Sequence, residues 1–297
     1  MDIRVLNYFV TIVQTKSISN AAQALHITQP TLSRQIRDLE EELETVLFHR
    51  GSREIQLTED GQYLYNRAIE ILTLVNKTEH SIRHSHEVSG ELYIGMAESQ
   101  SLDIIAKAIK HLIDKYPGIK VHTRSGNGNR IQEELDQGIL DFGITFGPYD
   151  DRKYDSLPIK NRDQWGVLLP KGHPLTQIDS LELKDIINYP LIVSGQSNID
   201  FTALAGLGDY EIVATYDLLF NASLLVKEGL GIALCLGGVI PTDYDQSQLD
   251  FVSFALENTD PLQVIWTKQN RQSALAKAFL TSLEETLKEN YSELKKG

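Results

Sequence analysis

The residues best suited to chemistry lie in a segment that reads QPTLSRQIRDLEEEL at positions 29–43. Arg34 and Arg37 are three residues apart, so in a helix both guanidinium groups lie opposite a stripe of leucine and isoleucine at four- and three-residue spacing. Guanidinium groups bind guanine edges and phosphates. Because the acidic residues follow only at positions 38–42, the N-terminal half of this helix is suited to enter a DNA major groove. The expected DNA contacts are Ser19, Thr28, Gln29, Pro30, Thr31, Ser33, Arg34, Arg37, His49, Arg50 and Arg53.

The elements before this segment decide between contact with DNA and a merely solvated amphipathic helix. Apolar residues at helical spacing predict a first helix over residues 3–13, and Ser17 or Ser19 can cap a second, short helix. His26 tolerates the left-handed backbone that a tight turn between helices needs, and Thr28 is a good N-cap for the next helix. A lone helix favours the solvated interpretation, but helix, turn and helix together favour DNA binding.

Two short strands around a turn are expected directly after this helix, in the stretch LFHRGSREIQLT. Phe48 and Leu57 point toward a core on either side of the turn at Gly51 and Ser52. Basic residues surround the turn and suit contact with phosphate groups or the minor groove. These residues are His49, Arg50 and Arg53.

The stretch AAQALHITQPTLSRQIRDLEEELETVLFHR, followed by LTEDG, resembles the winged helix-turn-helix of LysR-type transcriptional regulators. The resemblance is close up to position 60, although the family often has Ala where this chain has Asp60. It implies a regulator of transcription that binds double-stranded DNA as a homo-oligomer. A dimer of N-terminal units makes the operator an interrupted palindrome. The resemblance further implies a tetramer, formed by a second contact between the C-terminal domains.

Three segments are expected: the winged helix-turn-helix over residues 1–58, a linker helix over 59–88 and an effector-binding domain over 89–297. Thr58 can cap the linker helix, which contains neither Gly nor Pro after Gly61. Its apolar residues alternate at four- and three-residue spacing, as in a coiled coil. Pairing with a second copy is therefore favoured over the alternative, packing against its own domain. The expected dimerisation residues are Leu64, Ala68, Ile71, Val75 and Ile82.

Strands and helices alternate from Gly90 onward, which predicts parallel sheets with helices on their faces. The order of these elements resembles the effector domains of LysR-type regulators, which are similar to two-lobed periplasmic solute-binding proteins. That resemblance implies a first lobe over about 89–161 and 267–297 and a second lobe over about 162–266. The expected fold is thus multidomain: a mostly α winged helix-turn-helix, a long linker helix and an α/β two-lobed, periplasmic-binding-protein-like effector domain.

Polar loops follow several of the predicted strands, where ligands bind in open α/β sheets. Hydroxyl and amide groups there, together with helix N-termini, suit a small polar or anionic metabolite bound between the lobes. Ordinary helix capping is the alternative for each residue alone. Glu98 and Asp217 argue against a purely anionic ligand, since they could meet an amine or hydroxyl. The expected effector contacts are Ser99, Gln100, Ser101, Gly126, Asn127, Phe146, Ser194, Gln196, Ser197 and Asn221.

The net charge of −13 argues against nucleic-acid binding by the chain as a whole. The first 87 residues, however, hold 9 Lys and Arg against 12 Asp and Glu, a net of −3, which leaves −10 for the remainder. A local basic surface near the N-terminus therefore stays compatible with the composition.

Enzymatic function is not expected, because the sequence has neither a nucleophile elbow nor a glycine-rich phosphate loop after a strand. His80, His84 and His86 are spaced as metal ligands can be, but a solvated helix end is the favoured interpretation, so neither a metal nor a cofactor is expected. A catalytic protein ranks behind the main competing hypothesis, a solute-binding or transport-related protein, which the α/β portion alone would fit.

A cytoplasmic location is expected. Cys235 is the single cysteine, which excludes an intrachain disulfide and fits a reducing compartment. No apolar run reaches the ~18 residues of a membrane span, and the N-terminus lacks the pattern of a secretory signal. No membrane partner is therefore expected.

Overall fold

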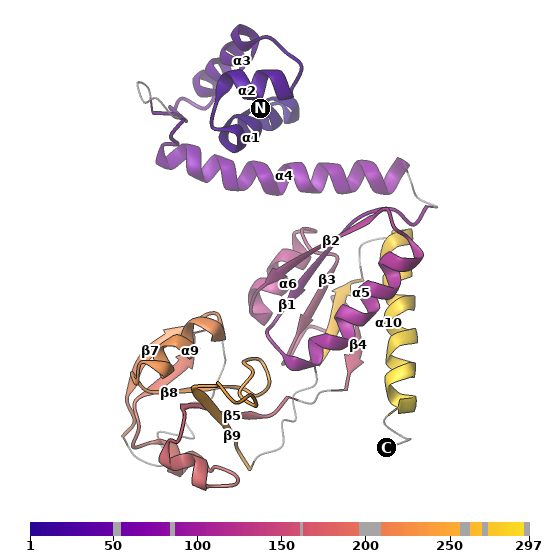
Figure 1. Ribbon diagram of the computed structural model, residues 1–297. Helices are drawn as coiled ribbons and strands as arrows, with labels where there is room; N and C mark the ends of the chain where they lie inside the picture. The colour runs from indigo at the N-terminus through magenta and orange to yellow at the C-terminus, as the bar shows by residue number, and fades with distance from the viewer. Residues whose placement is uncertain are drawn as a thin grey trace. The chain divides into compact units, whose positions relative to one another are not determined.

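The computed structural model describes residues 1–49, 55–83, 87–160, 163–195, 209–255, 262–268 and 273–293. The chain divides into two compact units, Met1–Ser85 and His86–Gly297 (Figure 1). Among the described residues no helix is both long enough and apolar enough to cross a membrane. The same part of the chain contains no group of three or more His, Cys, Asp or Glu side chains able to hold a metal ion.

The described residues of the N-terminal unit form four helices around one apolar cluster. The helices are α1 (Ile3–Thr15), α2 (Ile18–Ala24), α3 (Gln29–Glu42) and α4 (Glu59–Arg83). Asp2, Ser17 and Thr28 cap the first three, each accepting a hydrogen bond from a backbone N–H of the first turn. The fully buried side chains at the centre of the cluster include Leu6, Phe9, Ile12, Leu32, Leu39 and Leu47.

The turn between α2 and α3 has the geometry that the sequence predicts. His26 adopts a left-handed conformation with φ of 54°. Its N–H donates to the carbonyl oxygen of Gln23 at 3.2 Å, and the N–H of Ile27 donates to that of Ala22 at 3.0 Å. These bonds satisfy carbonyls that the end of α2 leaves without helical partners. The second helix therefore stops abruptly, and α3 can start in a new direction.

The described parts of the wing join α3 to α4. Phe48 and Leu57 form an isolated antiparallel bridge, and the ring of Phe48 lies 5.3 Å from that of Phe9. Thr58 caps α4, because its hydroxyl accepts from the N–H of Gly61 at 3.0 Å. A Cβ at Gly61 would lie 2.1 Å from the carbonyl oxygen of Leu47, so only glycine lets the wing pack this closely on α4.

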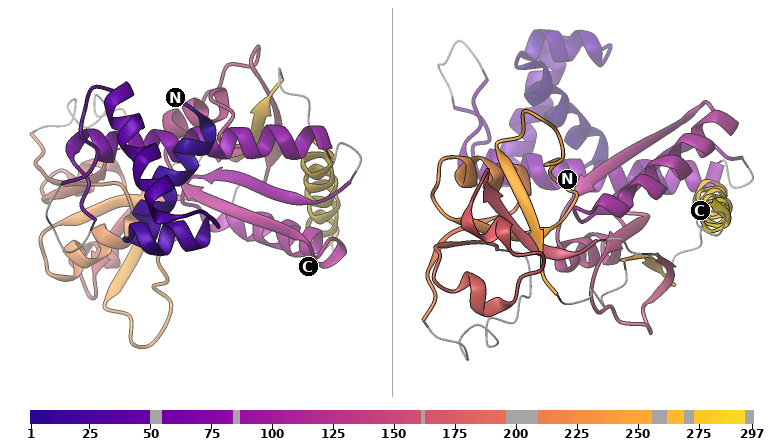
Figure 2. Two further views of the ribbon diagram at one scale, coloured as in Figure 1. Left: turned by 90° about the horizontal axis from the view of Figure 1, so that it is seen from above. Right: turned by 60° about the horizontal axis from the view of Figure 1, so that its bottom comes forward.

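The part of the C-terminal unit that the structure describes forms two five-stranded sheets. The first has the order β2-β1-β3-β10-β4, with β1 parallel to β2 and β3 and with β10 antiparallel to β3 and β4. Figure 2 shows the long strands β1 and β2 side by side. The strands are β1 (Gly90–Met96), β2 (Ile119–Ser125), β3 (Phe142–Thr145), β4 (Tyr154–Ile159) and β10 (Leu262–Thr267).

Helices cover both faces of this first sheet. One face packs on α5 (Asp103–Lys115), which follows a short 3-10 helix η1 (Gln100–Leu102), and on α10 (Ala274–Glu293). The other face packs on α6 (Gly128–Asp136) through Ile131 and Leu135. The predicted alternation of strands and helices thus forms a sheet between two helical layers. The sheet is mixed rather than parallel as predicted, because β10 runs antiparallel to β3 and β4.

The second sheet has the order β7-β6-β8-β5-β9, in which β6 is parallel to β7 and β8 while β5 is antiparallel to β8 and β9. Its strands are β5 (Trp165–Pro170), β6 (Leu191–Ser194), β7 (Ile212–Tyr216), β8 (Ile232–Leu236) and β9 (Leu249–Ser253). One face carries η2 (Pro174–Gln177) and α7 (Leu183–Ile186), and the other carries α9 (Leu219–Lys227). Cys235 on β8 is buried, and burial raises the pKa of its thiol to about 12, so it is a packing residue.

One lobe boundary differs from the sequence-based expectation. Residues 262–266 were expected in the second lobe, but β10 pairs with β3 and β4 of the first sheet. The chain therefore returns to the first lobe before Leu262 rather than near Thr267. The local pattern of a strand does not reveal its partner, because strand pairing is set by the whole sheet.

Candidate nucleic-acid interface and effector site

The face of α3 that points away from the core carries the two arginines. Leu32, Ile36 and Leu39 are buried on the opposite side of the helix. The side chain of Arg34 is 81% exposed, and Arg37 is also exposed. Burial of the apolar stripe thus fixes the rotation of α3 about its own axis. The arginines and the positive end of the helix dipole then lie on the surface of the unit.

The ion pair of Arg34 with the described part of the chain is weak. Its Nε lies 3.9 Å from Oδ2 of Asp38, one turn further along α3, and both side chains are more than half exposed. Exposed ion pairs of this kind contribute little, because water and salt screen them. The guanidinium group can therefore exchange Asp38 for an acceptor on a base or a phosphate at little cost.

Polar side chains at the start of α3 are held in place by one another. The hydroxyl groups of Thr28 and Thr31 are 2.8 Å apart, and the hydroxyl of Thr28 also accepts from the N–H of Thr31. The hydroxyl of Ser19 on α2 donates to Oε1 of Gln29 at 3.4 Å. Gln29 and Pro30 are exposed in the first turn, whereas Ser33 is partly buried. The structure thus brings the α2 and α3 residues of the predicted DNA surface together at one end of α3.

The wing contributes one described residue to this surface. His49 is exposed, and its backbone N–H donates to the carbonyl oxygen of Gln56 at 2.9 Å. Arg50 and Arg53 lie outside the described residues, and their contact with DNA stays a prediction.

The predicted seam along α4 divides into two parts. Ala68 is fully buried in the core of its own unit, and Leu64 and Ile71 pack against the same core. Ala68 is therefore removed from the dimer seam, because its own unit already covers it. Val75 remains partly exposed, and Ile82 is 74% exposed near the end of the helix. The part of the seam that a second copy could cover thus begins after Ile71.

In the C-terminal unit, the carboxyl ends of β1, β2 and β3 bring the first group of predicted effector residues to one sheet edge. Ser99 follows β1, Asn127 follows β2, and Phe146 follows β3. Asn127 caps α6, since its Oδ1 accepts from the N–H of Arg130 at 2.8 Å. Gly126, beside Asn127, is partly buried, and its N–H donates to the carbonyl oxygen of Met96. Asn127 is thus a helix cap, which is the alternative to effector binding that the sequence left open for each of these residues.

The second group of predicted residues follows strands of the second sheet. Ser194 ends β6 and is partly buried, whereas Asn221 on α9 is exposed. Gln196 and Ser197 lie outside the described residues. The two groups lie near one another, because Glu98 of the first lobe accepts a hydrogen bond from the N–H of Leu219 in α9.

Gln100 makes a further contact between the lobes. A Cβ on Gly238, which has φ of 76°, would lie 2.4 Å from Oε1 of Gln100. Glycine is therefore favoured at position 238 by its left-handed backbone conformation, and the absence of a Cβ leaves room for the end of the flexible Gln100 side chain. The amide of Gln100 thus rests on the loop after β8, as expected for a residue between the lobes.

Asp163 is the residue at this site that sequence reasoning missed. It lies between β4 and β5, where the chain passes from the first sheet to the second, and is 3% exposed. Its carboxylate accepts hydrogen bonds from the hydroxyls of Ser99 and Ser101 and from the N–H of Gln100. No local pattern marks such a residue, because its partners are more than 60 positions away.

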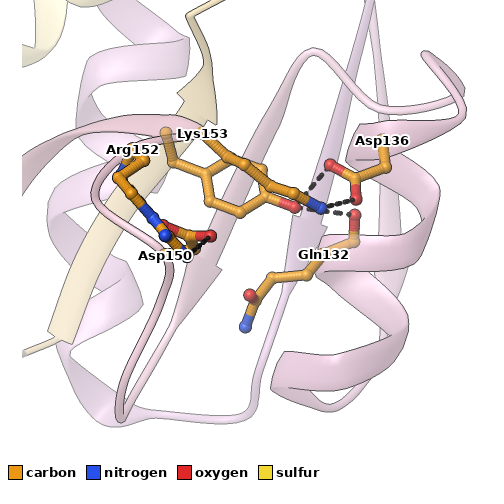
Figure 3. Close-up of polar contacts among 6 residues, drawn as sticks. Gln132, Asp136, Asp150, Arg152 and Lys153 are labelled. Carbon is orange, nitrogen blue, oxygen red and sulfur yellow. Dashed lines mark hydrogen bonds and ion pairs between the residues drawn. The ribbon is translucent and has the colours of Figure 1, made fainter.

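A polar cluster fixes α6, the helix that Asn127 caps (Figure 3). The hydroxyl of Tyr154 donates to Oδ1 of Asp136 at 2.6 Å, and Nζ of Lys153 lies 3.0 Å from Oδ2 of the same carboxylate. The hydrogen bond from Tyr154, and then the ammonium of Lys153, lower the pKa of Asp136. Nearby, the hydrogen bond from Arg152 lowers the pKa of Asp150 to about 2. The C-terminal half of α6 is thus tied to the start of β4.

Comparison with known families gives two matches. Residues 3–62 match the family described as bacterial regulatory helix-turn-helix protein, lysR family. Residues 85–288 match the family described as LysR substrate binding domain. Together the two matches span both units of the chain.

Individual relatives agree with these matches. An uncharacterized HTH-type transcriptional regulator of Bacillus subtilis, YvbU, is 31% identical over 79% of this chain and 81% of its own length. The HTH-type transcriptional regulator BenM of Acinetobacter baylyi is 26% identical over 98% of this chain and 97% of its own. The solved structure of full-length CbnR in complex with its target DNA has a TM-score of 0.68 at 19% identity, covering 96% of this chain and 100% of CbnR.

Proposed function

Because this chain belongs to the LysR family of bacterial helix-turn-helix transcriptional regulators, we propose that a metabolite bound in its C-terminal unit modulates how the protein binds DNA. DNA is bound through α3 and the wing, and the metabolite is a small polar or anionic molecule held between the two lobes. The match of residues 3–62 to a regulatory helix-turn-helix family overturns the alternative of a solute-binding or transport-related protein.

The observation that carries the DNA half of the proposal is the exposed Arg34 and Arg37 surface on a helix whose rotation the core fixes. The side chains from Ser19 to Arg37 that surround it would lie in a major groove, with the acidic C-terminal end of α3 outside. CbnR, which shares this fold, has been solved with its target DNA, and this supports the use of the same unit here.

Self-association forms the second part of the proposal. Two N-terminal units pair through Val75 and Ile82 of α4, with Leu64 and Ile71 beside the seam, and so read an interrupted palindrome. A second contact between C-terminal units makes a tetramer. The protein works in the cytoplasm, where its DNA lies, and it needs no metal or other cofactor besides the metabolite.

The effector half of the proposal is supported by the two groups of strand ends that approach each other at Glu98 and Leu219. Ligands in open α/β sheets bind at such carboxyl ends. The match to a LysR substrate binding domain supports the same location. The proposed contacts in the first lobe are Ser99, Gln100, Ser101, Gly126, Asn127 and Phe146, and those in the second lobe are Ser194, Gln196, Ser197 and Asn221.

The DNA half is tested by fluorescence anisotropy on the DNA upstream of the protein's own gene. Arg34→Ala should weaken binding to the specific site by about 1–3 kcal/mol while leaving binding to random DNA nearly unchanged. Arg152→Ala is the matched control, because it removes an equally exposed arginine from the other unit. Wild-type affinity of the Arg34 variant for the specific site would show that α3 does not read bases.

The effector half is tested in two steps on the full chain. A thermal-shift screen of polar and anionic metabolites identifies binders, and DNase I footprints are then recorded with and without each binder at saturation. A change in the length or spacing of the footprint is expected, because a ligand shifts an assembly when its affinity differs between the two arrangements. Identical footprints with every binder would remove the proposed modulation while leaving the DNA half intact.

A further inference from the structure

Three hydrogen-bond donors of the first lobe converge on one buried carboxylate. Oδ2 of Asp163 lies 2.6 Å from the hydroxyl of Ser99 and 2.9 Å from that of Ser101, and Oδ1 lies 3.0 Å from the backbone nitrogen of Gln100. Ser99 is 9% exposed, Ser101 is fully buried, and Asp163 is 3% exposed. The carboxylate is therefore enclosed and bonded through both oxygens, rather than resting on the surface.

Two hydroxyl groups and a backbone N–H are what a protein uses to bind a small carboxylate ligand. The three donors belong to Ser99 and the start of η1, directly after β1, where a ligand of the interlobe site is expected to bind. Asp163 itself comes from a different part of the chain, just before β5. All three donors are thus already bonded to a carboxylate of the chain itself.

We propose that Asp163 is an intramolecular ligand and determines which effectors the site accepts. Its carboxylate occupies the anion position formed by Ser99, Gln100 and Ser101, so an external carboxylate cannot use these donors while Asp163 is in place. This inference rests on the proposed function for the location of the effector site, and it narrows the class of effector. The wild-type site takes neutral or cationic molecules with hydroxyl or amine donors.

A second carboxylate near this position acts in the same direction. Oε2 of Glu98 lies 2.8 Å from the backbone nitrogen of Leu219, the first residue of α9. The N–H of Leu219 is thus another hydrogen-bond donor that is already bonded to a carboxylate of the chain itself. An anionic effector would enter beside Asp163 and Glu98, and like charges repel strongly where water is excluded. An amine or hydroxyl would instead find acceptors there.

The test is chemical rescue of the full chain. Asp163→Ala removes the carboxylate and leaves the three donors around a hole that formate fits. Thermal unfolding of wild type and variant is followed in sodium formate and in sodium chloride at equal ionic strength and pH. The variant should melt lower than wild type in chloride, and formate should raise its Tm by roughly 2–4 °C. The Tm of wild type should not respond to formate.

Asp155→Ala is the matched control, because Asp155 is an exposed aspartate on β4 that pairs only with Lys268 at 3.7 Å among the ion pairs of the described residues. Equal responses to formate in wild type and both variants would overturn the proposal, as would a folded Asp163→Ala protein that ignores formate. If Asp163→Ala does not fold in chloride, refolding from urea in formate decides. Recovery in formate alone supports the proposal, and recovery in neither salt overturns it.

A second variant checks that the rise in Tm with formate depends on the space left by the missing carboxylate. Asp163→Asn keeps the shape of the side chain, so its Tm should stay insensitive to formate, and a formate response equal to that of Asp163→Ala would contradict the inference. None of these measurements uses DNA or an unidentified effector. Failure of the rescue is therefore distinguishable from failure of the proposed function, which the footprints report.

Discussion

Glu98 of the first lobe accepts a hydrogen bond from the backbone N–H of Leu219 in the second lobe, with 2.8 Å between Oε2 and the nitrogen. Leu219 is the first residue of α9, and Leu218 at the N-cap position offers no side-chain hydrogen bond. The first turn of a helix has N–H groups that need acceptors, and a negative charge there is favourable. A carboxylate from one lobe thus takes the place of a capping residue in the other.

Glu98→Ala should therefore loosen both the start of α9 and the contact between the lobes. A hydrogen bond to a charged group is worth about 1.5–3 kcal/mol, so the amide of Leu219 should exchange at least about tenfold faster in hydrogen–deuterium exchange. Glu228→Ala, at the exposed far end of the same helix, serves as the control. Unchanged exchange at Leu219 in the Glu98 variant would show that this bond does not hold the helix start.

The exposed end of α4 gives a prediction about assembly. Val75→Glu together with Ile82→Glu should separate the proposed dimer of N-terminal units, because each change removes about 1.5–3 kcal/mol of apolar burial and adds a charge to the seam. The dimer dissociation constant should rise at least about a hundredfold. Light scattering on a dilution series measures it. Asn66→Glu, on the exposed opposite side of α4, should leave the mass unchanged. A double variant of wild-type mass would reject this seam.

The turn at His26 gives a prediction about stability. With φ of 54°, His26 occupies a conformation that β-branched residues strongly disfavour. His26→Val should therefore destabilise the N-terminal unit by about 1–2 kcal/mol, whereas His26→Gly should be close to neutral. Hydrogen–deuterium exchange of the amides in α2 and α3 of the full chain measures the difference. Equal exchange in the two variants would mean that the turn carries no conformational cost.

The helix caps, the turn at His26 and the alternation of strands and helices could be predicted from the sequence because each is a local property. Thr28 caps α3 through its own neighbours, and a strand alternates with a helix at a period visible in a short window. The burial of Ala68 was missed because the same four-three spacing serves packing inside the unit and pairing with a second copy.

Contacts between distant positions were beyond the reach of such patterns. The pairing of β10 with β3 and β4, and the bonds from Ser99 and Ser101 to Asp163, depend on how the chain crosses twice between the sheets. Sequence placed Ser99 and Ser101 at a strand end correctly, but it left their partner unassigned. Because Asp163 accepts from both hydroxyls, it decides which ligand Ser99 and Ser101 can bind. The chemistry of this site is therefore set more by which distant segments the topology brings together than by the local sequence around Ser99.

The cluster around Asp136 makes stability depend on pH. The hydrogen bond from Tyr154 lowers the pKa of Asp136 below its ordinary value of 3.8, with a further contribution from Lys153. A carboxylate whose pKa is lowered by folding stabilises the folded state above 3.8, and this contribution is lost as the pH falls through the folded-state pKa. Burial, and then the bond to Asp136, raise the pKa of Tyr154, so its contribution persists below pH 10 and is lost only in strong alkali.

Asp136→Asn should therefore lower the melting temperature of the C-terminal unit most at neutral pH, and the difference from wild type should shrink as the pH drops below 3.8. The side chain of Asp136 is 42% exposed, so water weakens the effect, and a decrease of about 2–4 °C at pH 6 is expected. Calorimetry of the full chain between pH 3 and 6, with the exposed Asp245→Asn as control, measures it. A constant difference across this range would mean that Asp136 acts through the shape of its side chain. In that case the ionised carboxylate would contribute nothing to holding α6 against β4.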